Sequence, residues 1–399
     1  MSKAPARSMV TVIALSAAAC MICATSDGIR NNYGIMLQGI ISNSGVDYAS
    51  ISLVLAVSQL FYGMIQPFFG LLAERKSNTL TLLIGAALTL SGLLMLPYCK
   101  NTITLMGCLG LLMPAGIGAT SYGILMGSVS PKIPTHTIPI FSGFLNACSG
   151  VGNAALSPII QSLMAKGGIY AVSMALSVPV AILVPLCFYV GKREPGYRPA
   201  PKASQGHFSD ALANRTYRLL MLAFFTCGFH MALISNHLPS QITTYGISAS
   251  TSAWAFSLYG IVTMLGSVYS GWLTARCNMK NVAAVYFGSR TIITAIFLIL
   301  PKTPISVFIY AAFLGLTGAA TVPPVSGLIS EEFGAARIAS LYGFVFFIHQ
   351  IGGFLGAWLG GLCYQFTGSY VQIWIVDMIL AAIAAAACYA IHEKQAAVS

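Results

Sequence analysis

Six ionisable side chains stand inside long apolar stretches of this sequence, where a charge is costly and therefore marks a candidate functional site. They are Asp27, Arg30, His230, Arg290, His349 and Asp377. An arginine can hold a planar carboxylate through two parallel hydrogen bonds, and a histidine can gain or lose a proton near neutral pH. These residue types in apolar surroundings predict the binding of an anion, the carriage of a proton, or both.

The sequence has no arrangement that is typical of an enzyme. Eight of its ten cysteines stand singly, and Cys20 and Cys23 have C-x-x-C spacing inside an apolar run. No Cys/His cluster stands at metal-ligand spacing, so the cysteines predict small packing residues. It also lacks a nucleophile elbow, a phosphate-binding loop and a pair of carboxylates at catalytic spacing. We therefore expect no catalytic residue, no metal and no cofactor.

The elements that must position the six residues are membrane-spanning helices. Charged residues make up 7% of the chain and apolar residues 57%, whereas a soluble domain carries about 25% charged residues. A helix of about 20 apolar residues crosses a bilayer. Apolar runs broken by Gly, Pro, Asn or charge predict twelve such helices, over residues 9–39, 49–72, 78–98, 102–129, 136–164, 168–190, 217–243, 250–274, 279–301, 304–329, 337–363 and 370–391.

The basic residues between these helices and at their ends are distributed unevenly. Fifteen fall in segments on the side of the N-terminus, and the opposite loops hold only Lys100, Lys166 and Lys302. Because Lys and Arg concentrate in cytoplasmic loops, this bias predicts that both termini lie in the cytoplasm. The net charge of +11 is then an orientation signal, and we expect no nucleic-acid partner.

An internal repeat divides the chain into two related parts. A shift of 200 residues superimposes Gly28 on Gly228, Gly118 on Gly318, Gly143 on Gly343 and Gly152 on Gly352. The sequence thus predicts an N-terminal six-helix half over 1–190, a cytoplasmic linker over 191–216 and a C-terminal six-helix half over 217–399. Parallel repeats of this kind place a binding site at their interface, near the membrane midplane.

Two predicted cytoplasmic loops carry a related motif, G-L-L-A-E-R-K at residues 70–76 and G-W-L-T-A-R at residues 271–276. Both resemble the loop signature G-x-L-A-D-R-x-G-R-R of the major facilitator superfamily. The resemblance implies an all-α polytopic fold with twelve transmembrane helices in two halves. It also implies a cytoplasmic latch, with gating roles for Glu74, Arg75 and Arg276, although the second copy has Ala275 in place of the acid.

Other segments narrow the resemblance. They are D-G-I-R-N-N-Y-G from residue 27, P-P-V-S-G-L-I-S-E-E-F-G from 323, L-Y-G-F-V-F-F-I-H-Q-I-G-G-F-L-G-A-W-L-G-G from 341 and F-T-G-S-Y from 366. They look like bacterial members of the monocarboxylate transporter and oxalate:formate antiporter group, which implies transport of small organic anions across the bacterial inner membrane. The better-studied members of this group carry an arginine in the eighth helix, whereas this sequence has Gly266, Ser267 and Val268 close to that position. If an anion binds here, another cation must hold it.

Arg30 is the predicted anion anchor, because the first helix of the superfamily lines the central cavity and the repeat sets His230 on the equivalent seventh helix. An internal ion pair between Asp27 and Arg30 is the alternative. Further substrate contacts are expected from Asn31, Tyr33, Tyr122 and His349, although each could be a packing contact between helices. The candidates for a coupling proton are Asp27, His230 and His349, and either histidine could instead be a neutral residue bonded to a neighbouring helix.

Arg290 is the most deeply placed charge, about 16 Å into the ninth predicted helix. The ninth and twelfth helices of the superfamily lie at the periphery, which makes Asp377 on the twelfth a natural counter-charge. A structural pair between Arg290 and Asp377 and a direct role of Arg290 in the site both remain open.

We therefore expect a secondary transporter that moves a small monocarboxylate-like anion by alternating access, together with a proton. Its partners are the substrate and the lipid bilayer, and it acts as a monomer. An exporter of drugs or amphipathic metabolites is the main alternative. A membrane sensor or scaffold without transport is a further one, which the lack of a sizeable soluble region in the sequence disfavours.

Overall fold

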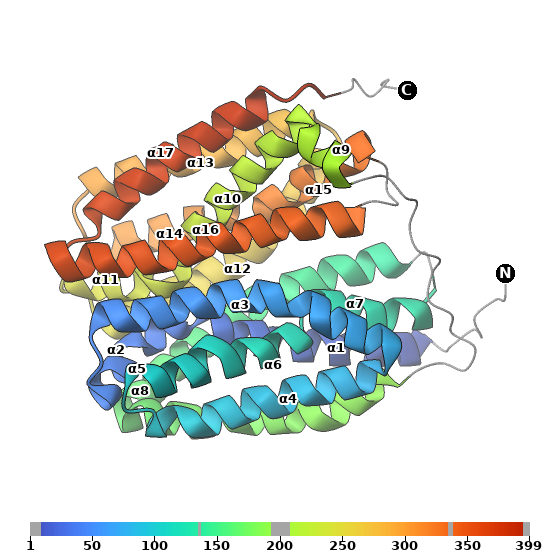
Figure 1. Cartoon of the computed structure of the whole chain (residues 1–399). Coiled ribbons are helices and arrows are strands. Elements are labelled where there is room, and N and C mark those ends of the chain that lie inside the picture. Colours follow the sequence, from blue (N-terminus) through green and yellow to red (C-terminus); the bar gives the residue numbers. More distant parts are fainter. Residues whose placement is uncertain (1–8, 135–136, 193–207, 334–337, 394–399) are drawn as a thin grey trace. The chain divides into compact units, whose positions relative to one another are not determined.

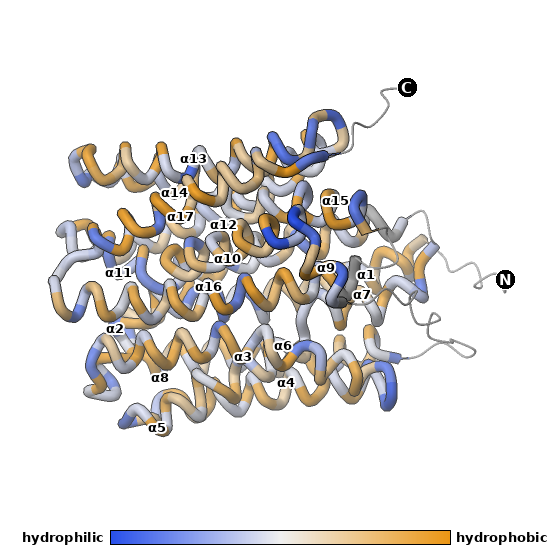
Figure 2. The backbone as a smooth tube through the Cα atoms, turned by 45° about the horizontal axis from the view of Figure 1, so that its top comes forward, coloured by the Kyte–Doolittle hydropathy of each residue, from blue (hydrophilic) through white to orange (hydrophobic). Residues whose placement is uncertain are grey.

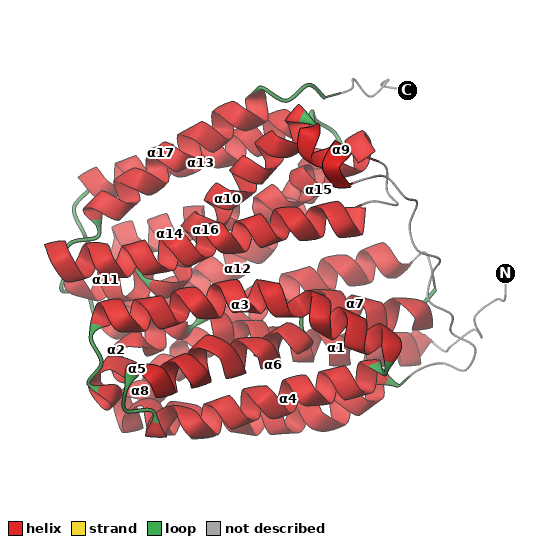
Figure 3. Ribbon diagram, in the orientation of Figure 1, coloured by secondary structure: helices red, strands yellow, loops and turns green. Residues whose placement is uncertain are grey.

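The computed structural model describes residues 9–134, 137–192, 208–333 and 338–393, and every regular element in these ranges is a helix (Figure 3). The chain divides into two compact units, Met1–Ala200 and Pro201–Ser399 (Figure 1). The division falls within the predicted linker. Eleven of the described helical segments are long and apolar enough to cross a membrane.

The first unit begins with α1 (Met9–Asn31) and α2 (Tyr33–Ser44), which the sequence predicted as one helix ending at residue 39. The chain breaks at Asn32, whose side-chain amide donates to the carbonyl of Gly28 at 2.7 Å. The unit continues with α3 (Tyr48–Arg75), α4 (Asn78–Met95), a 3₁₀ turn (Leu96–Tyr98), α5 (Thr102–Leu105), a π-helical turn (Met106–Leu112), α6 (Met113–Ala119), α7 (Tyr122–Val129), a 3₁₀ turn (Ser130–Lys132) and α8 (Ile138–Gly191).

The long helix α8 bends at two consecutive glycines. Gly167 is non-helical, and Gly168 has a φ of 60° and a ψ of −155°, a combination that only glycine adopts readily. The bend separates two segments that correspond to the predicted helices 136–164 and 168–190. Counting α8 twice raises the eleven spanning segments to the predicted twelve.

The second unit contains α9 (Phe208–Ala213), α10 (Arg215–Asn236), α11 (Leu238–Thr244), α12 (Ala249–Thr274), α13 (Met279–Ile299), α14 (Pro304–Gly318), a 3₁₀ turn (Ala319–Thr321), α15 (Val322–Phe333), α16 (Ile338–Thr367) and α17 (Val371–Tyr389). The short helix α9 lies inside the predicted linker, and α10 begins before the predicted end of the linker. Ala211 of α9 is fully buried in the apolar core of the unit, which explains the extra helix. Residues 193–207 of the linker lie outside the described residues.

A break interrupts the tenth predicted span between α14 and α15. A 3₁₀ turn (Ala319–Thr321) interrupts the α-helical hydrogen bonds after Gly318, and Pro323 and Pro324 in the first turn of α15 have no backbone N–H to offer. The carbonyls at the end of α14 therefore need other donors.

Glycines related by the repeat make the same kind of contact in the two units. In the first, a Cβ on Gly28 of α1 would lie 2.8 Å from the carbonyl of Gly152 in α8. In the second, a Cβ on Gly228 of α10 would overlap the carbonyl oxygen of His349 in α16. Small residues let helix backbones approach closely, so these glycines fix the packing of α1 on α8 and of α10 on α16.

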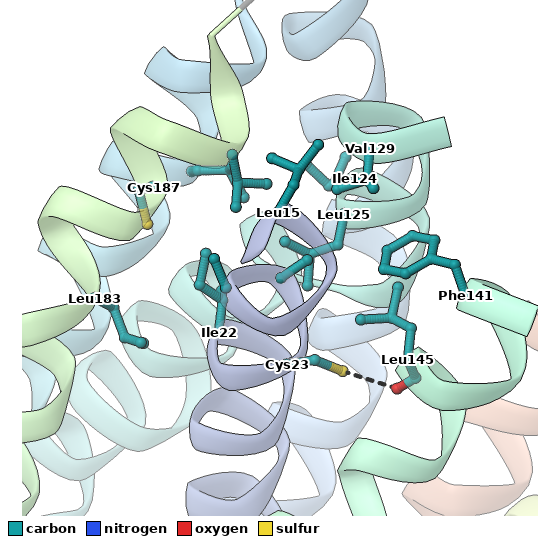
Figure 4. Close-up of a cluster of buried hydrophobic side chains, with 14 of the residues drawn as sticks. Leu15, Ile22, Cys23, Ile124, Leu125, Val129, Phe141, Leu145, Leu183 and Cys187 are labelled. Carbon is teal, nitrogen blue, oxygen red and sulfur yellow. Dashed lines mark hydrogen bonds between the residues drawn. The ribbon is translucent and has the colours of Figure 1, made fainter. Parts of the chain in front are cut away.

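Each unit has an apolar interior and an apolar exterior. Figure 4 shows part of the interior of the first unit, where Leu15 and Ile22 of α1 pack near Leu125 of α7 and Leu145 of α8. Large apolar side chains also face outward, and Ile299 is 85% exposed. Hydrophilic residues gather at helix ends and connections (Figure 2). An apolar exterior along the helices is what lipid requires of a spanning structure.

Candidate functional site

Arg30 lies on α1 and is held by two side chains of α3. Its Nη1 donates to Oε1 of Gln59 at 2.8 Å, and its guanidinium carbon lies 4.2 Å from the ring centroid of Tyr62. Gln59 and Tyr62 are three residues apart and so share a helix face. They orient the guanidinium from one side.

No described residue forms a hydrogen bond with the opposite edge of the guanidinium. Nε is buried and has no hydrogen-bond partner, and Nη1 is the one guanidinium nitrogen that bonds to a described residue. Nε and Nη2 form the edge that grips a carboxylate through two parallel hydrogen bonds. The described residues thus leave one two-pronged donor edge of Arg30 open.

Asp27 stands one turn before Arg30 but is not its partner. No ion pair joins the two residues, and Oδ2 of Asp27 instead accepts from the thiol of Cys23 at 3.6 Å. The internal pair considered from the sequence is therefore not observed. Arg30 is a partly buried cation that has no carboxylate at ion-pair distance among the described residues.

The next residues of the same segment fasten α1 to α8. Asn31 donates to the hydroxyl of Ser149 at 3.2 Å, and Asn32 donates to Oδ1 of Asn153 at 3.1 Å. Asn32 is fully buried and also accepts from the hydroxyl of Ser157 at 2.8 Å. This polar cluster holds the broken end of α1 and so positions Arg30, which directly precedes Asn31.

The two predicted tyrosines differ in their surroundings. The hydroxyl of Tyr33 is buried and has no hydrogen-bond partner, which leaves it available to a bound polar group. The hydroxyl of Tyr122 lies 2.6 Å from the hydroxyl of Ser142, and its side chain is 38% exposed.

In the second unit, His230 of α10 pairs with Asp377 of α17. Nδ1 of His230 lies 2.7 Å from Oδ2 of Asp377, and the side chains are 1% and 2% exposed. Trp374, one turn before Asp377, meets the imidazole edge-on at 6.1 Å. The sequence predicted His230 as a substrate contact, whereas within its own unit the imidazole is directed at a carboxylate.

The predicted pair of Arg290 and Asp377 is wrong. Nη2 of Arg290 donates to the carbonyls of Thr317 and Gly318 at 2.7 and 2.8 Å, and no ion pair links it to Asp377. The cause is the break after α14, which leaves carbonyls without intrahelical donors and sets the negative end of the helix dipole beside the guanidinium. Arg290 is 1% exposed and caps α14.

His349 of α16 is half-buried among aromatic rings. Its imidazole stacks on Phe346 at 5.3 Å and lies 5.4 Å from the ring of Phe224. Its Nδ1 is 3.2 Å from Oε1 of Gln350. No carboxylate pairs with it among the described residues, in contrast to His230.

The sequence profile described as Major Facilitator Superfamily matches residues 17–243 and again residues 220–398. The chain belongs to this superfamily. Its members are transporters, so the protein is a multi-pass membrane transporter and not an enzyme.

Individual superfamily members are more distant. An uncharacterised transporter, YcxA of Bacillus subtilis, is 25% identical over 375 residues, which cover 90% of each chain. The oxalate:formate antiporter of Oxalobacter formigenes is 25% identical over 350 residues, 86% of this chain and 81% of that one. The resemblance to this group is thereby confirmed.

A crystal structure with the same fold is that of a bacterial homologue of the human lysosomal transporter Spinster, in an inward-facing and unoccupied conformation. It has a TM-score of 0.76 and 14% sequence identity, and the match covers 96% of this chain and 97% of that one. The predicted architecture of twelve transmembrane helices in two six-helix halves is confirmed as the superfamily fold.

The two superfamily loop motifs differ in their local contacts. Glu74 and Arg75 are exposed at the end of α3, and Arg276 after α12 stacks its guanidinium on Trp272 at 4.3 Å. At the start of α13, near the second loop, Glu393 accepts from the backbone N–H groups of Met279 and Lys280 at 2.8 and 3.1 Å. Gating roles for Glu74, Arg75 and Arg276 stay predictions.

Three residues that contact the candidate site residues were not predicted from the sequence. Two of them, Gln59 and Tyr62, bind Arg30. Gln59 could have been predicted, because an amide side chain inside the second apolar stretch is unusual. Trp374, whose indole donates to Oε1 of Gln241 at 2.6 Å, gave no signal beyond an ordinary aromatic residue. The described residues contain no group of three or more His, Cys, Asp or Glu side chains that could hold a metal.

Proposed function

We propose that this protein is a secondary transporter of a small organic anion of the monocarboxylate type, and that Arg30 is the anchor for the substrate carboxylate. The two units would move about the substrate so that the site opens to each side of the membrane in turn. A co-transported proton would balance the charge of a monovalent anion. The protein would act as a monomer.

The observation that carries this proposal is the open edge of Arg30. A partly buried cation that has no ion-pair partner among the described residues is costly in an apolar medium, and the cost falls when an anion binds to it directly. Gln59 and Tyr62 hold the guanidinium at one side and leave Nε and Nη2 as a preformed pair of donors. A planar carboxylate matches that pair, whereas a cationic or purely apolar ligand does not.

Neighbouring polar groups extend the proposed site. The buried hydroxyl of Tyr33 has no partner and would donate to a second oxygen of the substrate. Asn31 would contribute its amide on exchange of the bond to Ser149, and Tyr122, His230 and His349 stay more remote candidates. The oxalate:formate antiporter is named for two small anions that carry carboxylate groups, so the similarity to it supports a small organic anion as the substrate.

Localisation and orientation are part of the proposal. The bacterial relatives and the excess of basic residues on one side support a bacterial inner membrane with both termini in the cytoplasm. Tags at the two ends and within residues 193–207 should all be protected from protease in intact spheroplasts. A tag at the C-terminus that is cleaved from outside would contradict this orientation.

The deciding experiment is uptake into proteoliposomes that contain the purified protein. A thermal-shift screen against small carboxylates, amino acids and cationic dyes first selects ligands, because a ligand that binds the folded state raises its apparent stability. Radiolabelled uptake of the selected ligand is then compared for the wild type, Arg30→Ala and Arg218→Ala. Arg218 is an exposed arginine at the start of α10 and serves as the matched control.

Arg30→Ala should abolish anion uptake while Arg218→Ala retains it. Full anion transport by correctly folded Arg30→Ala would contradict the proposal. A screen in which cationic dyes bind and carboxylates do not, with dye transport unaffected by Arg30→Ala, would favour the export of drugs or amphipathic metabolites instead.

A further inference from the structure

The pair formed by His230 and Asp377 has the features of a site that binds a proton. The two side chains are almost fully buried, and 2.7 Å separates Nδ1 of His230 from Oδ2 of Asp377. The far atoms of both groups, Nε2 of His230 and Oδ1 of Asp377, are buried and have no hydrogen-bond partner. A purely structural pair in an apolar interior would be expected to satisfy these atoms as well.

The hydrogen bond to Asp377 determines which nitrogen of His230 is basic. An ionised carboxylate can only accept, so with Asp377 ionised Nδ1 carries the proton of the neutral imidazole and donates a hydrogen bond to Oδ2. Nε2 then holds a lone pair to which no described residue donates a hydrogen bond. A proton that arrives at Nε2 forms an imidazolium, and the adjacent carboxylate stabilises its charge.

The remaining titratable groups around the pair do not replace either partner. Arg290 on α13 is engaged with the carbonyls at the end of α14. Tyr310 on α14 bonds through its hydroxyl to Thr294, and its ring meets Trp374 at 6.0 Å. His349 on α16 stacks on Phe346. No second carboxylate among the described residues bonds to His230, so its protonation depends on Asp377.

We propose that the pair of His230 and Asp377 is the binding site of the coupling proton, with Nε2 as the atom that receives it. This inference rests on the proposed transport function and assigns its two ions to different units. Arg30 in the first unit binds the anion, and the His230 pair in the second unit binds the proton. Without the proton the pair carries one negative charge, and with it the pair is neutral.

The first test is independent of any substrate. Nitrogen NMR of the histidine-labelled protein, with His230→Gln to identify the signals, should find the proton of neutral His230 on Nδ1. Nε2 should gain a proton as the pH falls from about 8 to about 5. In Asp377→Asn the protonated fraction of Nε2 at a given pH should differ from that of the wild type, because the neighbouring carboxylate is gone. Glu393→Gln, which neutralises a carboxylate at the end of α13, is the control.

The second test asks whether this proton drives transport. One proton per monovalent anion should give about tenfold accumulation for a gradient of about one pH unit. With radiolabelled lactate and pyruvate, two monovalent anions, as probes in proteoliposomes, Asp377→Asn should lose this accumulation and retain a far larger share of anion exchange. Asp27→Asn, which alters the other intramembrane aspartate, is measured alongside and should still accumulate anion.

Several outcomes would overturn the proposal. They are a His230 that stays neutral in the wild type over the whole pH range, an unchanged His230 titration in Asp377→Asn, and normal gradient-driven accumulation by Asp377→Asn. Loss of accumulation in Asp27→Asn, with Asp377→Asn intact, would assign the proton to the first unit. A wild type that transports neither probe would count against the proposed function, while the NMR titration would still decide the proton site.

Discussion

Replacement of Arg30 by lysine tests the open donor edge directly, because lysine keeps the charge and loses the two-pronged geometry. In the wild type, Nε and Nη2 would each donate one charge-assisted hydrogen bond to the substrate carboxylate, while Nη1 stays on Gln59. One such bond contributes about 1.5–3 kcal/mol. Loss of one bond should therefore weaken binding by about tenfold to about a hundredfold.

The same change has a predictable signature in thermal denaturation. A ligand at about a hundred times its Kd stabilises the wild type by about 2.7 kcal/mol. At that concentration Arg30→Lys should be stabilised by only about 0.4 to about 1.4 kcal/mol. Arg218→Lys, at an exposed position, should behave as the wild type.

A second variant separates the role of orientation from that of charge. Gln59→Leu removes the acceptor for Nη1 and frees the guanidinium to rotate, so it should weaken anion binding although Arg30 itself is intact. Equal ligand-induced stabilisation of the wild type and Arg30→Lys would refute the bidentate reasoning. An effect of Arg30→Lys without any effect of Gln59→Leu would show that α3 does not orient the anchor.

Three further changes test the packing of the units by unfolding of the purified protein. Arg290→Met should lower the free energy of unfolding by about 1–3 kcal/mol for each of the two carbonyls that it leaves without a donor. The double variant with Asp377→Asn should not regain the lost free energy of unfolding. A gain of stability in the double variant would instead support an ion pair between Arg290 and Asp377. Gly228→Ala should cost about 1–3 kcal/mol because its Cβ would overlap α16, whereas Gly343→Ala, which has open space, should be tolerated. Asp47→Ala removes the N-cap of α3 and should cost about 0.5–2 kcal/mol near neutral pH. Hydrogen bonds from the hydroxyl and the backbone N–H of Ser50 lower the pKa of Asp47. Its contribution should therefore be complete above about pH 3.9, the unfolded-state value, and vanish as the pH falls through the lower folded-state value.

The sequence by itself determined the class of this protein. Long apolar runs can only be membrane helices, because lipid offers no partner for an unpaired backbone group. The repeat also predicted which glycines matter, and Gly28 and Gly228 lie at equivalent helix contacts. These features depend on local composition and on a fixed spacing along the chain, which are visible without a structure.

The partners of the buried charges were decided only by the tertiary structure. Charge complementarity favoured Asp377 as the partner of Arg290, yet Asp377 bonds to His230, 147 positions away, and Arg290 bonds to carbonyls freed by the break after α14. Gln59, which holds Arg30, was likewise not predicted. A side chain meets whatever the rotation and depth of neighbouring helices bring to it, and these depend on contacts between segments far apart in the sequence.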